Sequence, residues 1–544
     1  MPDTVTAPAP IRFTHREILL MLSGTMCGMF LGAIDQTIVA TALPAMAGEL
    51  HGIEYMSWAV AAYLLTSTAS TPIYGKLSDL YGRRPLFVSA IAIFLLGSII
   101  CGAAQSMVML IGGRAVQGLG GGGLLSLSQT IMADLVPPRE RGRYQAYYST
   151  IWTTSTLGGP MLGGFLVDVA SWRWVFWINL PIAIAGLLIC NKQLKRLPIR
   201  GGPKKIDYLG AGLLVPGIVA LLLITTWGGN EFAWTSPQIL GLAAAALVLI
   251  ALLLVWESRA EDPLLPLRLF RNNVFVIGNS LGFLMGAAAV GATIFLPLFM
   301  QVVIGATASN SGLLITPLMI GITIGAIFTG CFIRWTGRYR IIPIVSLTIA
   351  ALSFIAFIDV TRATPVVYYV IAMTTMGIGL GPSGPMVSIS VQNSVEMRDL
   401  GTATSLNSFF RSLGGSFGVA LMGAILFAGL TGQGAGTPGI SAGGLLHGGP
   451  AVIASLPENV RAVIVASFGH SFRYVYMVGA AICILGVALA IFMKELPLRR
   501  WVHRRNPQKQ RRPRRDRRRP PSPRATARVS AQAGRPFLGL IGSM

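Results

Sequence analysis

The chain has 544 residues, of which 53% are hydrophobic and only 12% charged, and its formal net charge is +23. A soluble domain carries about 25% charged residues, so the composition excludes an ordinary soluble protein and indicates a membrane protein. The segment 494–544 holds 16 Lys and Arg residues against two acidic residues. Such a segment cannot bury a core, and we predict a disordered basic tail that contacts anionic lipid and has no nucleic-acid partner.

Apolar runs long enough to cross a bilayer, which takes about 20 residues, follow one another along most of the chain. The first of them, 18–43, exceeds the apolar part of a signal peptide, which is about 7–15 residues long, and is predicted to be an uncleaved span. We predict fourteen membrane spans, at 18–43, 55–75, 86–105, 107–128, 145–167, 174–191, 209–227, 238–257, 274–301, 311–333, 341–359, 366–390, 403–429 and 471–493.

The connections between these spans indicate the orientation of the chain, because cytoplasmic loops carry an excess of Lys and Arg. With a cytoplasmic N-terminus, the inner connections hold 19 Lys and Arg residues and the outer connections hold three. We therefore predict a multi-pass protein of the cytoplasmic membrane with both termini in the cytoplasm.

A carboxylate lies inside the first apolar run, in the stretch FLGAIDQTIVATALP (30–44). Asp35 costs about 2.5–3.5 kcal/mol at the middle of a membrane helix, so it needs a partner, a polar cavity or a function. Arg114 is the only basic residue between residues 106 and 127. At about 1.5 Å per residue, both lie roughly 10–12 Å below the outer surface, which predicts a shared polar cavity in which protonation of Asp35 releases Arg114. The alternative is a permanent structural ion pair.

A loop sequence occurs twice, as GKLSDLYGRR (75–84) and GCFIRWTGRY (330–339). The repeat aligns two glycines and one arginine of each copy: Gly75, Gly82 and Arg83 with Gly330, Gly337 and Arg338. In the first copy Asp79 and Arg83 are spaced to pair across one helical turn, which predicts a latch between helix ends. The alternative is an ordinary basic inner loop bound to lipid headgroups. The second copy has Arg334 in place of the acid.

The copies follow spans 2 and 10, so the spacing predicts two six-helix units with a helix pair inserted between them. The predicted layout is an N-terminal tail at 1–16, a first bundle at 17–200, an inserted pair at 201–260, a second bundle at 261–493 with an outer loop at 430–470, and the basic tail at 494–544. Repeated bundles with a binding site at their interface are the architecture of secondary transporters.

The fifth span contains STLGGPMLGG (155–164), in which Pro160 removes a backbone hydrogen bond and bends a helix. Gly159, Gly163 and Gly164 give this helix a smooth face, which we expect to slide against the other bundle.

Several polar and aromatic side chains in the spans are candidates for a substrate cavity, where aromatic rings suit aromatic or cationic compounds. They are Trp58, Tyr63, Gln117, Trp152, Asn407 and Arg411. The alternatives are packing or an interface position for the aromatic residues, and for Arg411 a side chain that reaches the inner headgroups.

Taken together, these stretches resemble the major facilitator superfamily, and more closely its fourteen-span drug:proton antiporters of the EmrB/QacA type. The resemblance covers about residues 17–500 and includes RAVQGLGGG (114–122), WRWVFWINLP (172–181) and LNSFFRSLGGSFG (406–418). It implies that Asp35 is linked to protons or substrate, that Arg114 is a buried arginine, and that Gly159 and Pro160 belong to an antiporter motif. That motif usually has glycine where this chain has Ser155.

We therefore expect a proton-coupled multidrug exporter of small lipophilic or cationic compounds, working as a monomer by alternating access and without a cofactor. The chain has no G-x-x-x-x-G-K-[ST] phosphate loop, which favours the proton gradient over ATP as the driving force. The alternative on the same fold is an importer or facilitator of a specific solute or lipid. A channel would need rings of pore-lining residues, and an enzyme would need clustered catalytic side chains, whereas the five histidines lie at loops or span ends.

Overall fold

The computed structural model describes residues 14–52, 55–196, 207–229, 231–305, 308–361, 363–432 and 457–498. All of them belong to one compact unit formed by residues 1–500. Most of the predicted tails at 1–16 and 494–544, and the middle of the predicted outer loop at 430–470, lie outside the described residues.

The described part of the chain is built of helices, and its β-pairing is limited to one isolated bridge between Gly228 and Phe232. This follows from the composition, because a backbone inside lipid has to satisfy its own hydrogen bonds. The helices up to the inserted pair are α1 (His15–Glu49), α2 (Met56–Tyr81), α3 (Arg83–Gly102), α4 (Met107–Leu135), α5 (Arg141–Val169), α6 (Trp174–Trp177), α7 (Asn179–Gln193), η2 (Leu194–Arg196), α8 (Tyr208–Trp227) and α9 (Pro237–Glu257). The later helices are η3 (Leu267–Arg271), α10 (Asn273–Phe299), η4 (Met300–Ile304), α11 (Ala308–Thr336), α12 (Ile341–Ala356), α13 (Val366–Leu380), α14 (Ser383–Ser394), η5 (Met397–Asp399), α15 (Leu400–Gly432) and α17 (Glu458–Ile491).

Several helix ends coincide with capping residues in the sequence. Thr14 and Glu17 form a capping box at the start of α1, while Ser106 and Asp207 accept backbone hydrogen bonds at the starts of α4 and α8. Such caps satisfy N–H groups that the helix itself leaves unpaired.

Each of the fourteen predicted spans coincides with one helix or with two consecutive helices. Ten helical segments within the described residues are long and apolar enough to cross a membrane. The protein is therefore a multi-pass helical membrane protein, and the number of fourteen crossings stays a prediction.

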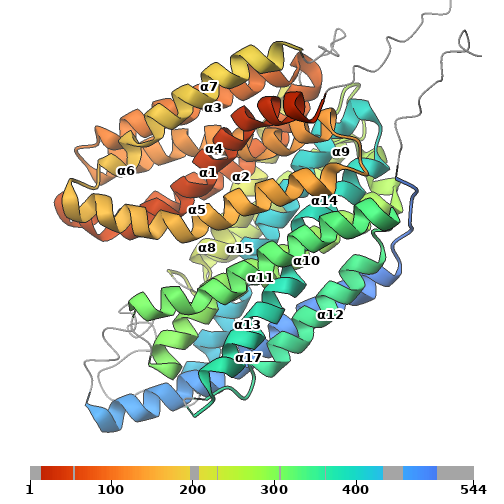
Figure 1. The fold of residues 1–544 in the computed structure, drawn as a ribbon. Helices are drawn as coiled ribbons and strands as arrows, with labels where there is room; N and C mark the ends of the chain where they lie inside the picture. The colour runs from red at the N-terminus through yellow and green to blue at the C-terminus, as the bar shows by residue number, and fades with distance from the viewer. Residues whose placement is uncertain are drawn as a thin grey trace, which may run out of the picture. The chain divides into compact units, whose positions relative to one another are not determined.

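Helix contacts divide the chain into two sets. Helices α1 to α7 pack mainly on one another, as do helices α10 to α17 (Figure 1). The two sets meet where α2 and α4 contact α15 and where α5 contacts α11 and α14. The boundaries predicted for two bundles agree with these contacts in outline but stay a prediction.

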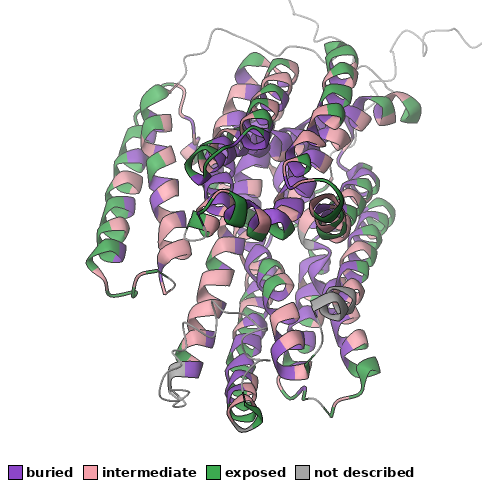
Figure 2. Ribbon diagram, turned by 90° about the vertical axis from the view of Figure 1, so that its left-hand side faces the viewer, coloured by how far each residue is buried: buried purple, intermediate pink, exposed green. Residues whose placement is uncertain are grey.

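One face of the inserted pair α8 and α9 packs against other helices of the protein, and the opposite face is exposed. Leu214, Ile218 and Leu222 of α8 are buried with Ala61 and Leu65 of α2 in one apolar cluster. In contrast, α9 exposes large apolar side chains along its length, including Leu240, Leu247, Leu252 and Val255. Figure 2 shows the same division, with buried residues inside and exposed residues on the outer helix faces. Apolar surface of this extent suits contact with lipid.

Candidate functional site

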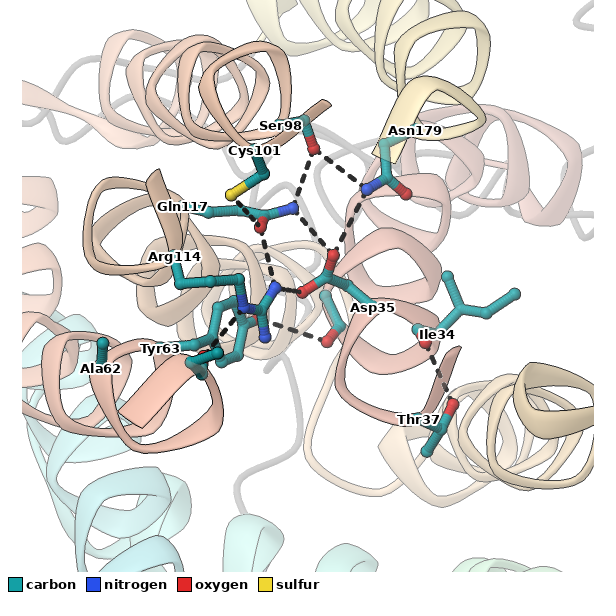
Figure 3. A network of polar contacts seen from close by, with 12 residues as sticks. Ile34, Asp35, Thr37, Ala62, Tyr63, Ser98, Cys101, Arg114, Gln117 and Asn179 are labelled. Atoms are coloured by element: carbon teal, nitrogen blue, oxygen red, sulfur yellow. Dashed lines mark hydrogen bonds and ion pairs between the residues drawn. The ribbon is translucent and has the colours of Figure 1, made fainter. Parts of the chain in front are cut away.

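A buried ion pair joins α1 to α4. Arg114 Nη1 lies 2.5 Å from Asp35 Oδ2, and the exposed fractions of the two side chains are 2% and 0%. The matched depths of the two charges predicted a shared site, and the structure brings them into direct contact (Figure 3). Because charges so deeply buried would be very costly alone, each one needs the other.

A ring of neutral polar groups completes the site around Asp35. Gln117 Nε2 donates to Asp35 Oδ1 at 2.7 Å and to Ser98 Oγ at 2.8 Å, and Gln117 Oε1 accepts from Arg114 Nη1 at 2.8 Å. Asn179 Nδ2 donates to Asp35 Oδ1 at 3.3 Å and to Ser98 Oγ at 3.0 Å. Five side chains from α1, α3, α4 and α7 therefore form one hydrogen-bonded network, which we call the Asp35 network (Figure 3).

The guanidinium of Arg114 has two further neighbours from α2. Its Nε donates to the carbonyl of Ala59 at 3.2 Å, and its Cζ lies 4.3 Å from the centre of the Tyr63 ring. Tyr63 is itself buried, with 1% of its surface exposed. These contacts give Arg114 neighbours in addition to Asp35.

Glycines bring the helices of this network close together. A Cβ on Gly97 of α3 would lie 2.5 Å from the Cα of Gln117, and a Cβ on Gly120 of α4 would lie 2.6 Å from the carbonyl of Ala90. Small residues at such contacts let helix backbones approach in a membrane. The glycine-rich stretch after Arg114 therefore allows α4 to pack closely against α2 and α3.

A second polar cluster, the gate cluster, consists of Asp79, Arg83, Asp134, Gly401 and Thr402. Arg83 forms ion pairs at 2.7 Å with Asp79, one turn earlier, and with Asp134 of α4. Asp79 also accepts hydrogen bonds from Gly401 N at 3.0 Å, Thr402 N at 2.8 Å and Thr402 Oγ1 at 3.0 Å. The carboxylate thus sits at the N-terminus of α15, where the helix dipole favours a negative charge.

The gate cluster links the two sets of helices. A Cβ on Gly75 would contact Ser405 Oγ and would lie 2.8 Å from the carbonyl of Gly401. Beside the cluster is a cavity of about 310 Å³ whose lining includes Lys76, Glu261 and Asp399. Lys76 Nζ donates to the carbonyl of Pro263 at 2.7 Å, so the segment that follows α9 is fastened to the same end of α2.

The second loop copy also lies at a contact between the two sets of helices. A Cβ on Gly142 of α5 would lie 2.5 Å from the Cα of Gly330, and Arg141 Nη1 donates to Gln392 Oε1 of α14 at 3.2 Å. The aligned glycines Gly82 and Gly337 both have positive φ, at 92° and 72°, a backbone conformation that glycine adopts without strain. The two copies therefore share a positive φ at the aligned glycine, while the acid occurs in the first copy alone.

The glycines of the predicted antiporter motif in α5 differ in their surroundings. Gly159 and Gly163 pack on α1, where a Cβ on either would contact Thr37 or Thr41. Pro160 is exposed, and a Cβ on Gly164 would meet open space. The close contact of Gly159 and Gly163 lies within the first set of helices, while α5 also packs on α11 and α14 of the other set. Sliding of these glycines against the other bundle stays a prediction.

The six residues predicted to line a substrate cavity differ in burial. Tyr63, Gln117 and Asn407 are buried in polar networks, and Asn407 Nδ2 donates to Asn279 Oδ1 at 3.3 Å. Trp58 packs against Trp227 at the end of α8, with ring centres 5.3 Å apart. Trp152 and Arg411 are exposed, and contact of any of the six residues with a substrate stays a prediction.

Sequence reasoning missed Ser98 and Asn179 in the Asp35 network, and Asp134 and Thr402 in the gate cluster. Asn179 carried a signal, since an amide inside an apolar run is costly unless it is hydrogen-bonded. Ser98 and Thr402 carried none, because serine and threonine often bond the backbone of their own helix.

A helical membrane protein with buried charges, whose two sets of helices meet through a polar cluster, has the architecture of a membrane transporter. The sequence matches the Major Facilitator Superfamily over residues 25–205 and 207–419, and the chain belongs to that superfamily. It is 38% identical over 409 residues to the multidrug transporter protein MdtP of Bacillus subtilis, covering 75% of each chain. It is 33% identical over 503 residues to multidrug resistance protein 3 of the same organism, covering 90% of this chain and 97% of the relative.

The chain is also similar to solved structures at low sequence identity, and this similarity is evidence for the fold alone. The proton:xylose symporter XylE aligns with a TM-score of 0.58 and 15% identity, covering 89% of this chain and 97% of that one. The chain is thus a transporter of the Major Facilitator type and not an enzyme.

Proposed function

We propose that this protein is a proton-coupled efflux transporter that exports several small lipophilic compounds by alternating access. The observation that carries the proposal is the Asp35 network, a titratable carboxylate held by a buried arginine inside the membrane part of the fold. Relatives that are named multidrug transporters support export of more than one compound.

Coupling of substrate transport to protons requires a group whose protonation changes the relative stability of the transporter's conformations. Protonation of Asp35 removes the charge that Arg114 neutralises. Arg114 would then still have two hydrogen-bond acceptors, the side chain of Gln117 and the carbonyl of Ala59. The loss of one buried ion pair changes the relative stability of the conformations in which α1 and α4 are in contact. One charge crossing about 100 mV supplies about 2.3 kcal/mol, which supports a roughly 50-fold substrate gradient.

The gate cluster is the second part of the proposed mechanism. We infer that the hydrogen bonds from Gly401 and Thr402 to Asp79 hold α15 against α2 while the substrate pathway is closed to the cytoplasm. These hydrogen bonds are expected to break when the pathway opens to the cytoplasm. The proposal includes fourteen spans, a location in the cytoplasmic membrane with both termini inside, and function as a monomer. It also includes contact of the basic tail with anionic lipid.

Transport in liposomes tests the proposal. Purified protein is reconstituted in liposomes with an acidic lumen, and accumulation of ethidium, a permanently charged dye, is followed alongside a neutral lipophilic dye. Wild type is expected to accumulate a dye only while the pH gradient lasts, and Asp35→Asn is expected to abolish this. Asp359→Asn, at an exposed ion pair at the end of α12, is the matched control and is expected to transport normally.

Two results would contradict the proposal. Equal transport by wild type and Asp35→Asn would mean that Asp35 is purely structural. Movement of dye only down its own gradient, whatever the pH, would favour a facilitator instead.

A further inference from the structure

Arg411 is a positive charge that has no partner among the described residues. It lies on α15, eleven residues after the helix begins at Leu400, which corresponds to about 16 Å along the axis. Arg114 and Arg83 are each bound to a carboxylate. In the described part of the chain, by contrast, the Arg411 guanidinium forms neither an ion pair nor a hydrogen bond. An arginine kept inside a membrane helix without a partner is costly, and such a residue commonly serves in binding.

The side chain of Arg411 points into the protein and not toward lipid. Its Nη1 would lie 3.9 Å from a Cβ built on Gly384, in the first turn of α14. Helix α14 packs against α5, α10, α11 and α15, so a group beside its first turn is surrounded by helices. Arg411 as a whole residue is nevertheless exposed, so part of its side chain is accessible. This position also argues against the alternative that Arg411 reaches the inner headgroups.

A helix N-terminus lies at the same place. The predicted span 366–390 is broken at Gly381 and Pro382, where α13 ends and the 12-residue helix α14 begins. Its N-cap residue, Pro382, makes no side-chain cap among the described residues. The N–H groups of a first helical turn carry partial positive charge and bind anions. A helix interrupted inside the membrane is also a recurring way in which transporters bind the charged group of a substrate.

The charge of the site selects its ligand. Asp35 is fully buried and committed to Arg114, so it does not offer a free negative charge to a cationic compound. Arg411 is accessible and unpaired, and the start of α14 adds to its positive potential. Trp152, an exposed aromatic residue, lies on α5, which packs against α14.

We propose that Arg411 and the N-terminus of α14 form an anion-binding site, and that the transported compounds include amphipathic organic anions bearing a carboxylate or sulfonate. This inference rests on the proposed transport function and specifies its substrate class. It differs from the expectation from sequence, which was of lipophilic or cationic compounds.

Binding of three probes with one fluorophore tests the site in the full-length protein in lipid nanodiscs, with empty nanodiscs subtracted. The probes are 1-pyrenebutyrate, neutral 1-pyrenebutanol, and a pyrene bearing a trimethylammonium group. Wild type is expected to bind the carboxylate at least about tenfold more tightly than the alcohol, the strength of one charge-assisted hydrogen bond. Arg411→Gln is expected to lose this preference and Arg411→Lys to keep part of it. Arg473→Gln, at an exposed ion pair on α17, is expected to match wild type.

The inference is overturned if wild type binds carboxylate and alcohol equally, or binds the cation most tightly. It is also overturned if Arg411→Gln weakens all three probes alike. Should Arg411→Gln fail to fold, the wild-type probe series and Arg411→Lys decide the question. Transport separates the two proposals: an Arg411-dependent preference without pH-driven transport refutes the exporter, while pH-driven transport of a dye without any preference for anions refutes the site.

Discussion

Replacement of Asp79 by asparagine should weaken the contact between α2 and α15. The carboxylate accepts three hydrogen bonds from Gly401 and Thr402 and forms an ion pair with Arg83. Asparagine keeps one acceptor oxygen but loses the charge and one of the two acceptors. Arg83 retains its ion pair with Asp134, so the main loss is at the start of α15.

The magnitude follows from these contacts. A hydrogen bond to a charged group contributes about 1.5–3 kcal/mol, and removal of a helix N-terminal cap costs about 0.5–2 kcal/mol. We take about 1.5–3 kcal/mol for the change, since the asparagine keeps part of the cap. The ratio of closed to open gate should then fall by roughly 10- to 150-fold.

The assay is a distance measurement between spin labels at Tyr81 and Trp335, which are exposed ends of α2 and α11, in a variant without the native cysteines. The population of short distances should decrease in Asp79→Asn and remain unchanged in Asp359→Asn. An unchanged distance distribution in Asp79→Asn would refute the reasoning that these hydrogen bonds hold the gate closed.

Three further substitutions test the packing and the Asp35 network through thermal unfolding in detergent. Arg114→Leu leaves Asp35 buried without its charge partner and should cost about 3–5 kcal/mol; a melting temperature equal to that of wild type would argue against a buried ion pair. Gln117→Leu removes a hydrogen bond to each member of the pair and should cost about 1–3 kcal/mol, and a neutral effect would mean that water replaces the amide. Gly159→Ala places a methyl group against α1 and should cost about 1–3 kcal/mol, whereas Gly158→Ala, where a Cβ meets open space, should be nearly neutral; equal effects of the two alanines would exclude the close contact between α1 and α5.

The positions of the long apolar segments could be predicted from the sequence. The fourteen predicted spans coincide with helices because a bilayer leaves no alternative backbone conformation to a long apolar run. Individual ends shifted where capping and tertiary contacts extended a helix; α1, for example, runs to Glu49 and α15 begins at Leu400. The sequence also indicated Asp35 and Arg114, since charges in apolar runs are rare and conspicuous.

The direction in which each side chain points could be determined only from the tertiary structure. Gly159 and Gly163 face α1, and Trp58 faces α8, although hydropathy treats all faces of a buried helix alike. Composition likewise did not distinguish Arg411, which has no partner, from Arg114, which has one. The sequence by itself determined the helical membrane fold and the residues that are costly to bury, because both follow from local composition. The tertiary structure alone decided which of those residues neutralise one another and which have no partner among the described residues, because that depends on contacts between helices far apart in the chain.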